Sequence, residues 1–328
     1  VYYLINTEIR YRGEKMDLEL TTKEPDDAQL EVAIESLKAA EGIEYKKKIG
    51  ELLIDGNKIL KEANIDTYIL DTQLLLGKVL GKDKLHLITN KEEEVSKFKE
   101  REFYSLIEKR KNKMPISYIL KTTEFMGLDL HVEEGVLIPR GDTEILVEET
   151  LKFMDEDKEY EVCDLCCGSG AIGISIAHFR ENTKVDLIDY YDVPEKVTKR
   201  NIVKQKLSNR AKFIKSDLLN EVINQQKKYD ILVSNPPYIK EEVIDTLMED
   251  VKDYEPHTAL SGGNDGLDFY RRIVDDSDKI LKENGILAFE IGHDQGEEVS
   301  NLMIEKGYKN VRVVKDLAGL DRVVIGNI

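Results

Sequence analysis

The stretch EVCDLCCGSGAIGISIAHFR, residues 161–180, decides the fold class of this chain. An apolar strand pattern ends in a glycine-rich turn, and an apolar helix pattern begins directly after the turn. Gly168, Gly170 and Gly173 have the spacing G-x-G-x-x-G, which in this context is typical of loops that bind an adenosine-containing ligand. Glycine there allows a sharp turn and a close approach of the backbone to the ligand. The alternative is a glycine-rich turn that holds no ligand.

From this stretch to the end of the chain, strand and helix patterns alternate. Such alternation predicts an α/β fold with a doubly wound, mostly parallel sheet of the Rossmann-like kind. Ligands of these sheets bind at the carboxyl ends of the strands. Further strands are expected at residues 184–192, 211–219, 229–238, 285–292, 308–319 and 321–328. Further helices are expected at residues 194–207, with a proline at the start, and at 265–284.

The chain before this stretch divides into three further parts. Residues 1–42 are interpreted as an N-terminal extension, a remnant of a fusion, with one or two strands and then an amphipathic helix that carries Val32 and Leu37. Residues 43–122 form a small helical domain, in which Phe98 is expected on the apolar side of a helix over 91–113. A β-hairpin linker at residues 123–140 turns at Gly127. The main domain follows at residues 141–328.

Composition argues against several classes of function. The net charge is −17, and an acidic chain repels nucleic acid at long range, so no direct nucleic-acid binding is expected. No apolar run approaches the roughly 18 residues of a membrane span, and no signal peptide is visible. We therefore expect a cytoplasmic protein without a membrane partner.

The three cysteines of the chain, Cys163, Cys166 and Cys167, stand together in one strand-like run. An odd, clustered count does not form a disulfide framework. A zinc site normally takes four ligands, and no second Cys/His cluster follows. We expect buried thiols and no metal.

Three acidic residues follow predicted strands beside the glycine-rich loop. Asp189 lies sixteen positions after Gly173, where a carboxylate can bind ribose hydroxyls. The loop pattern does not separate NAD from S-adenosylmethionine, because both contain adenosine. Asp164 precedes the loop, where its carboxylate can meet an ammonium group, and this favours S-adenosylmethionine. Asp217 can accept from an adenine amino group, although a helix N-cap is a strong alternative for it.

The sequence Asn235-Pro236-Pro237-Tyr238 follows a predicted central strand at residues 231–233. Each proline fixes φ, lacks an N–H and holds the preceding residue extended. The Pro236 carbonyl and the Asn235 side-chain oxygen are therefore two rigid acceptors, which suit a planar –NH2 group. Holding both hydrogens favours charge on the nitrogen during attack on a sulfonium methyl group, and Tyr238 can cover the planar group. The alternative is an ordinary Pro-Pro turn.

Together these motifs resemble a known family of enzymes. The segments DLCCGSGAIGISIA and SNPPYI resemble class I S-adenosylmethionine-dependent methyltransferases that act on planar nitrogens. The segments EFMGLDLHVEEGVLIPRGDTEILVE, YEPHTALSGGNDGLDFYRRI and DLAGLDRVVIG are similar to the bacterial peptide chain release factor glutamine methyltransferases. The resemblance covers roughly residues 45–328.

The resemblance implies methylation of the glutamine in the Gly-Gly-Gln motif of class I release factors, which dock on the N-terminal helices. It implies that Asp189 holds the ribose of the methyl donor, that Asp217 and Leu218 flank its adenine, and that Asn235 also contacts it. Residues 235–238 would hold the substrate glutamine. The remaining residues that would line the donor are Cys166, Cys167, Gly168, Ser169 and Gly170.

Some positions depart from the family pattern, and two other functions stay open. Gly141 replaces a usual proline, Lys121 a usual glycine and Leu320 a frequent arginine, while Leu218 stands where a larger aromatic residue can face adenine. One alternative is an adenine amino-group methyltransferase acting on DNA or RNA, which shares the Asn-Pro-Pro-Tyr sequence. The other is a non-catalytic module that binds release factors or ribosomes.

Overall fold

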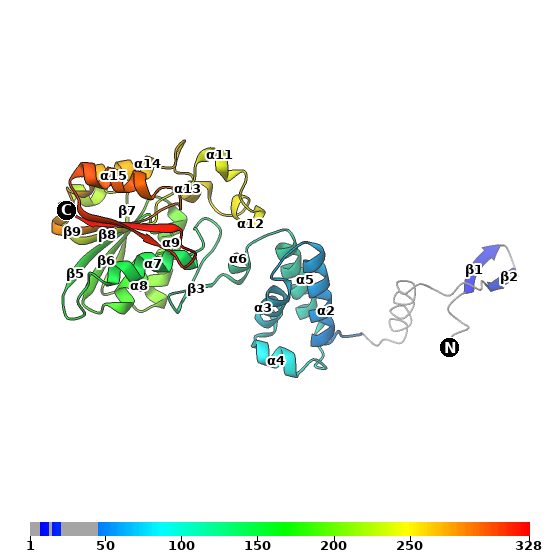
Figure 1. The fold of residues 1–328 in the computed structure, drawn as a ribbon. Helices are drawn as coiled ribbons and strands as arrows, with labels where there is room; N and C mark the ends of the chain where they lie inside the picture. The colour runs from blue at the N-terminus through cyan, green and yellow to red at the C-terminus, as the bar shows by residue number, and fades with distance from the viewer. Residues whose placement is uncertain (1–6, 13–14, 21–44) are drawn as a thin grey trace. The chain divides into compact units, whose positions relative to one another are not determined.

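The computed structural model describes residues 7–12, 15–20 and 45–328 (Figure 1). The chain divides into two compact units, Val1–Ile107 and Glu108–Ile328. In the first, β1 (Thr7–Arg12) and β2 (Lys15–Leu20) pair as an antiparallel hairpin, which confirms the strands expected near the start. The amphipathic helix expected around Val32 lies outside the described residues. No helix in the described ranges is long and apolar enough to span a bilayer.

From Tyr45 onward, the part of the first unit that the structure describes contains four helices around an apolar core. Gly81 ends α3 in the left-handed conformation (φ 66°), as the sequence predicted, and the Asp83 carboxylate caps α4 by accepting from the His86 N–H. Gly56 allows close contact between helices, because a Cβ there would lie 2.6 Å from Thr72 and 2.9 Å from Phe103. The helices are α2 (Ile49–Glu62), α3 (Tyr68–Leu80), α4 (Lys84–Thr89) and α5 (Lys97–Lys111), the last of which continues into the second unit.

The expected position of Phe98 was wrong. Its side chain is 77% exposed, and α5 begins only at Lys97. The residues before it are extended because they pair with another part of the chain: the Val95 N–H donates to the Lys47 carbonyl, and the Ile49 N–H donates to the Glu93 carbonyl. Helical periodicity counted from Lys91 therefore assigned Phe98 to the wrong side.

The second unit contains a short hairpin at the start of the expected linker, residues 123–140, whose role as a linker stays a prediction. It follows a short helix, α6 (Ile116–Leu120), and consists of β3 (Thr123–Phe125) and β4 (Leu128–Leu130), which pair antiparallel. Gly127 at the turn has φ 72°. Phe125 and Leu130 are buried, so the hairpin packs its apolar face against the main core.

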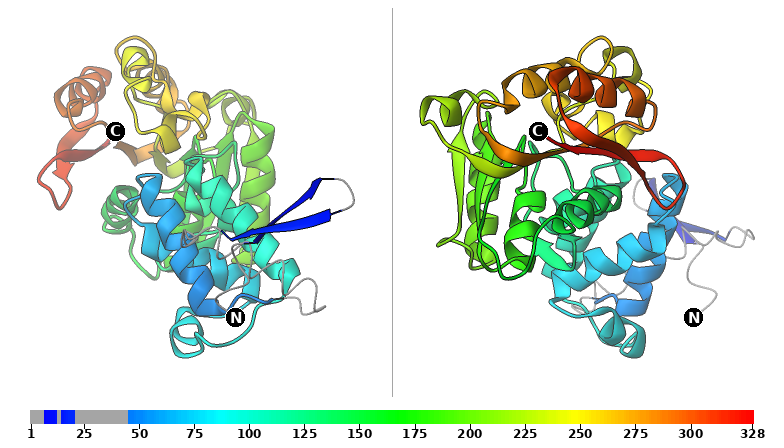
Figure 2. Two further views of the ribbon diagram at one scale, coloured as in Figure 1. Left: turned by 90° about the vertical axis from the view of Figure 1, so that its right-hand side faces the viewer. Right: turned by 60° about the vertical axis from the view of Figure 1, so that its left-hand side comes forward.

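A seven-stranded sheet in the order β10-β11-β9-β8-β5-β6-β7 forms the centre of the second unit (Figure 2). The five strands from β9 to β7 are parallel, whereas β11 pairs antiparallel with both β9 and β10. This confirms the predicted doubly wound, mostly parallel sheet. The strands are β5 (Tyr160–Leu165), β6 (Thr183–Asp189), β7 (Ala211–Lys215), β8 (Tyr229–Ser234), β9 (Leu281–Glu290), β10 (Lys309–Lys315) and β11 (Asp321–Asn327).

Helices cover both faces of this sheet, with α7 and α8 on one side in Figure 1 and α14 and α15 on the other. Successive residues of β5 pack on opposite faces of the sheet. Val162 belongs to the hydrophobic core that contains Ile174 of α8, and Cys163 belongs to the core that contains Ile273 of α14. A 3-10 turn at Gly141–Thr143 precedes α7. The helices are α7 (Glu144–Leu151), α8 (Ala171–Phe179), α9 (Asp192–Lys204), α10 (Asn220–Asn224), α11 (Glu241–Ile244), α12 (Glu249–Lys252), α13 (His257–Leu260), α14 (Asp268–Ser277) and α15 (Gly296–Lys306).

Other expected helix boundaries were displaced as well, and two of them are informative. The helix expected from residue 194 begins at Asp192, so that Pro194 occupies its third position. The helix expected to reach residue 284 ends at Ser277, and β9 begins at Leu281 because Leu281 pairs with Tyr229 of β8. Long-range pairing, which a local pattern cannot show, decided the second boundary.

Candidate active site

A cavity of about 290 Å³ lies at the carboxyl ends of the parallel strands, where the doubly wound topology predicts a ligand site. Seven segments line it: the turns after β5, β6, β7 and β8, the segment after the hairpin, the start of α13 and the start of α14. The sequence-predicted residues that line it are Cys166, Gly168, Asp189, Asp217, Leu218, Asn235 and Pro237.

The glycine-rich loop bends sharply between β5 and α8. Cys166, Gly168 and Gly170 all have positive φ, at 58°, 54° and 81°. A Cβ on Gly170 would lie 3.0 Å from side-chain carbons of Ile174 and Leu187, so glycine is required there by space as well as by conformation. Of the loop residues expected to line the donor, the structure places Cys166 and Gly168 at the cavity wall.

The other three expected loop residues are not among those that line the cavity. Cys167 and Ser169 are buried, and Gly170 caps α8. The Cys167 thiol lies 3.6 Å from the Thr198 hydroxyl of α9, and the Gly170 N–H donates to the Cys167 carbonyl at 2.7 Å. These contacts stabilise the bent conformation of the loop.

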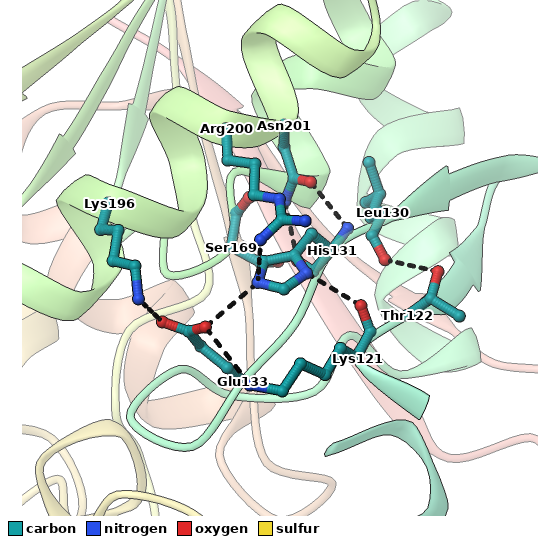
Figure 3. A network of polar contacts seen from close by, with 9 residues as sticks. All are labelled: Lys121, Thr122, Leu130, His131, Glu133, Ser169, Lys196, Arg200 and Asn201. Atoms are coloured by element: carbon teal, nitrogen blue, oxygen red, sulfur yellow. Dashed lines mark hydrogen bonds and ion pairs between the residues drawn. The ribbon is translucent and has the colours of Figure 1, made fainter. Parts of the chain in front are cut away.

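A buried amide on α9 holds the loop and the linker together (Figure 3). The Asn201 Nδ2 donates to the carbonyls of Ser169 and His131, both at 2.9 Å, and its Oδ1 accepts from the His131 N–H at 2.7 Å. The Thr198 hydroxyl adds a bond to the Gly168 carbonyl at 2.9 Å. Sequence analysis missed both residues; the available signal was a polar side chain on the apolar side of an amphipathic helix.

Asp189 is oriented by three backbone N–H groups. Its Oδ2 accepts from Gly168 at 3.0 Å, and its Oδ1 accepts from Tyr190 at 2.8 Å and from Tyr191 at 3.2 Å. Burial raises the pKa of Asp189, and these hydrogen bonds oppose the rise. The carboxylate is thus fixed at the cavity wall with lone pairs left for hydroxyl donors.

Asp164 lies beneath the loop and is fully buried. Its Oδ2 accepts from the Gly173 N–H at 2.8 Å, while its buried Oδ1 has no hydrogen-bond partner within the described residues. Burial raises the pKa of Asp164 to about 7. Asp164 does not line the cavity, so only a group that reaches past the loop could pair with Oδ1.

Asp217 and Leu218 form the cavity wall beyond β7. Both Asp217 oxygens accept from the Arg272 guanidinium of α14, at 2.8 and 3.0 Å. The Asp217 carboxylate does not cap α10, whose N-cap residue is Leu219; in the first turn of that helix, the Glu221 N–H donates to the Ser216 hydroxyl at 3.0 Å. Leu218, at φ 48°, presents an apolar side chain to the cavity. Arg272 is a cavity residue that sequence analysis missed.

The Asn235–Tyr238 segment leaves β8 at the cavity. The Asn235 Nδ2 donates to the Thr143 hydroxyl at 3.5 Å, and within the described residues no donor reaches Asn235 Oδ1 or the Pro236 carbonyl. Asn235 and Pro237 line the cavity, whereas Pro236 is buried and Tyr238 lies outside the wall. The covering role of Tyr238 stays a prediction. Thr143, from the segment RGDTE, was missed as a partner of Asn235.

The three cysteine thiols lie in β5 and in the glycine-rich loop that follows it. Cys163 and Cys167 are buried, Cys166 is half-buried, and none of the three is in a disulfide. Burial raises the pKa of each thiol, which keeps it protonated. Across the described ranges no three His, Cys, Asp or Glu side chains are grouped to hold a metal ion.

Comparison with known proteins identifies the family. The chain is 52% identical over 274 residues to a release factor glutamine methyltransferase of Clostridium botulinum, covering 84% of this chain and 97% of the relative. The chain belongs to the release factor glutamine methyltransferase family. A Clostridium acetobutylicum member is 49% identical over 278 residues, covering 85% of this chain and 98% of the relative.

Family models match both parts of this methyltransferase. Residues 51–120 match the PrmC N-terminal domain, and residues 142–252 match the methyltransferase small domain. Among solved structures, a release-factor-specific protein-(glutamine-N5) methyltransferase from Alicyclobacillus acidocaldarius is 30% identical, with a TM-score of 0.38, covering 58% of this chain and 93% of that one.

Proposed function

We propose that this methyltransferase transfers a methyl group from S-adenosylmethionine to the side-chain amide nitrogen of the glutamine in the Gly-Gly-Gln motif of class I peptide chain release factors. The observation that carries the proposal is the pair of acceptors, Asn235 Oδ1 and the Pro236 carbonyl, which have no donor within the described residues. Asn235 lines the same cavity as Cys166 and Gly168 of the glycine-rich loop. The high identity to named release factor glutamine methyltransferases supports the same reaction.

The residues around the cavity fit the methyl donor. Asp189 would hold its ribose hydroxyls, and Leu218 would contact its adenine. The unpartnered Asp164 Oδ1 suits its amino group, because an ammonium ion would satisfy a buried oxygen that otherwise costs free energy. S-adenosylmethionine, when bound, supplies an electrophilic methyl group on a positively charged sulfur; when the bond from nitrogen to methyl forms, the bond from methyl to sulfur would break, S-adenosylhomocysteine would leave, and one hydrogen of the amide nitrogen would be released to water as a proton.

The acceptors explain how an amide nitrogen can be made to react. An amide nitrogen is a weak nucleophile because its lone pair is delocalised into the carbonyl. Asn235 Oδ1 and the Pro236 carbonyl would accept its two hydrogens, favouring the positive charge that develops on the nitrogen during attack. The two prolines hold these acceptors rigidly, so the nitrogen is oriented before reaction.

The helical domain is proposed to dock the release factor. It matches the PrmC N-terminal domain over residues 51–120, which makes it a family feature rather than an addition of this chain. A flexible loop such as the Gly-Gly-Gln segment needs contacts away from the glutamine to hold it at the cavity, and binding energy gained remotely can serve that purpose.

Transfer of radiolabelled methyl groups to alternative acceptors tests the proposal. The protein is incubated with labelled S-adenosylmethionine and a class I release factor, a release factor whose motif glutamine is replaced by alanine, or adenine-containing DNA and RNA oligonucleotides. We expect label only in the first release factor. Label in the oligonucleotides, or equal label in both release factors, would contradict the proposed substrate.

A further inference from the structure

A buried amide contacts the end of the acceptor segment. Gln295 directly precedes α15 and is 4% exposed, but its side chain does not cap that helix. Its Nε2 donates to the Tyr238 carbonyl at 3.0 Å and to the Gly266 carbonyl at 3.2 Å, and its Oε1 accepts from the Gly292 N–H at 2.9 Å. Burying an amide is costly unless it is hydrogen-bonded, and here both hydrogens and the oxygen have partners.

The three partners decide which way this amide is oriented. One end of the amide faces the Gly292 N–H, and the other end faces two carbonyl oxygens. A turned amide would bring its oxygen to the two carbonyls and its NH2 group to the N–H, so all three hydrogen bonds would be lost. Gln295 is therefore a donor toward the acceptor segment. A carboxylate in its place could accept from Gly292 but could not donate to the carbonyls.

The loop after α13 packs against the same end of the segment. The Ile239 N–H donates to the Leu260 carbonyl at 2.9 Å, and the Gly262 N–H donates to the Ile239 carbonyl at 2.8 Å. Gly262 lies so close that an added Cβ would be 2.7 Å from the Tyr238 Cα and 2.8 Å from the Pro237 carbonyl oxygen. The chain therefore leaves the two prolines along a path that its neighbours fix closely.

The contacts at Tyr238 help to fix the place of the acceptors. On one side, the acceptor segment continues β8, which pairs with β5 and β9. On the other side, the Tyr238 carbonyl accepts from Gln295 and the Tyr238 hydroxyl donates to Glu290 Oε1 at 3.2 Å. The prolines between these points have fixed φ and no N–H with which to make a bond of their own. The position of the Pro236 carbonyl therefore depends on how both ends are held.

We propose that Gln295 is a positioning residue of the methyl-acceptor site, which fixes the end of the segment Asn235–Tyr238 through the Tyr238 carbonyl. The inference rests on the proposed function and extends it. Without the NH2 group of Gln295, two carbonyls lose their shared donor, and the segment is held by fewer bonds at one end. The two acceptors are then less well aligned with the substrate amide, which slows methyl transfer more than it weakens the binding of either substrate.

Two substitutions of Gln295 test the proposal. Gln295→Met has a similar length and makes none of the three hydrogen bonds, whereas Gln295→Glu keeps an acceptor for the Gly292 N–H but loses the NH2 group. We expect each to lower kcat for release-factor methylation by about 10- to 100-fold, as small displacements of reacting groups do. The Kd for S-adenosylmethionine and the Kd for the release factor, both measured by calorimetry, should change by less than about 3-fold.

A third variant and a matched control separate positioning from a structural role. Gly262→Ala leaves Gln295 intact but brings a Cβ against the acceptor segment, so it should also lower kcat while both Kd values stay within about 3-fold. Tyr308→Phe removes a buried hydrogen bond beyond the other end of α15, from the Tyr308 hydroxyl to the Ser277 hydroxyl at 2.6 Å. This control should keep kcat within about 2-fold of the wild type.

The outcomes distinguish this inference from the function on which it rests. Folding of each variant is checked by thermal melting, and Gln295→Glu keeps the test informative if Gln295→Met does not fold. Folded variants of Gln295 with kcat within about 2-fold of an active wild type, or with a donor Kd that rises as much as kcat falls, would overturn the positioning role alone. An equal loss of kcat in Tyr308→Phe would do the same. A wild type that binds the donor but methylates no release factor would overturn the proposed function and this inference with it.

Discussion

At the scale of single residues, the carboxyl group of Asp164 is fully buried and therefore removed from water. Its unfolded-state pKa is near 3.8, and burial raises the folded-state pKa to about 7. The folded protein therefore binds an extra proton between these two values. The free energy of unfolding falls as pH rises through this window, and the stability given by the proton is lost above about pH 7.

Asp164→Asn should remove this pH dependence. The asparagine cannot ionise, so the variant should not lose stability in this pH window as the wild type does. The free energy of unfolding of the variant minus that of the wild type should therefore increase by about 2 to 4 kcal/mol between pH 5 and pH 8. Urea unfolding of both proteins across this range measures the difference. A difference that stays constant with pH would show that Asp164 is not desolvated as described.

The same substitution should weaken donor binding. A neutral amide cannot form the charge-assisted bond that the Asp164 Oδ1 offers to an ammonium group, so the Kd for S-adenosylmethionine should rise by about 10- to 100-fold. Calorimetric titration at pH 8 measures it, with Asp230→Asn, outside the cavity wall, as the control. An unchanged Kd would contradict the assignment of Asp164 to the donor.

At the scale of elements, the turn between β5 and α8 depends on glycine for two separate reasons. Gly170 needs positive φ and also lies against Ile174 and Leu187. Gly307, which ends α15, needs positive φ as well but has no atom within 4 Å of an added Cβ. A side chain at Gly307 would therefore cause conformational strain alone, whereas a side chain at Gly170 would cause both conformational strain and steric overlap.

Gly170→Ala should therefore be more destabilising than Gly307→Ala. We expect losses of about 1 to 2 kcal/mol at Gly307, from conformation alone, and about 2 to 5 kcal/mol at Gly170, where overpacking is added. Chemical denaturation measures both, and donor affinity should fall only for the Gly170 variant. Equal losses at the two positions would contradict the close contact beneath the loop.

Features with local causes could be predicted from the sequence, whereas those with distant partners could not. The turn at Gly127 and the acceptors at Asn235 and Pro236 depend on residues next to one another in the chain. By contrast, Thr143 is 92 residues from Asn235, and Glu290 is 52 residues from Tyr238. Periodicity and spacing cannot reveal such pairs.

At the scale of the whole molecule, the family features lie in only part of the chain. The family models match residues 51–120 and 142–252, and the C. botulinum relative aligns with 84% of this chain while 97% of its own length is covered. The cavity and its predicted residues lie within the second compact unit. Within the part of the chain that the structure describes, the residues that line the cavity lie between Gly135 and Arg272.

A chain that begins at Tyr45 should therefore keep its function. We expect its Kd for S-adenosylmethionine and its kcat for release-factor methylation to stay within about 3-fold of the full chain, because each of the described residues that line the cavity is retained. Calorimetry and radiolabel transfer measure both. A loss of tenfold or more in either would show that the first 44 residues take part in folding or in docking.

The most direct test of the central claim is fragmentation mass spectrometry of a release factor treated with this protein and S-adenosylmethionine. The account predicts a single added methyl group on the glutamine of the Gly-Gly-Gln motif. Asn235→Ala should lower the rate by about 100-fold or more, through loss of an acceptor, while the exposed control Asn209→Ala keeps it. A methyl group on any other residue, or full activity in Asn235→Ala, would contradict the account.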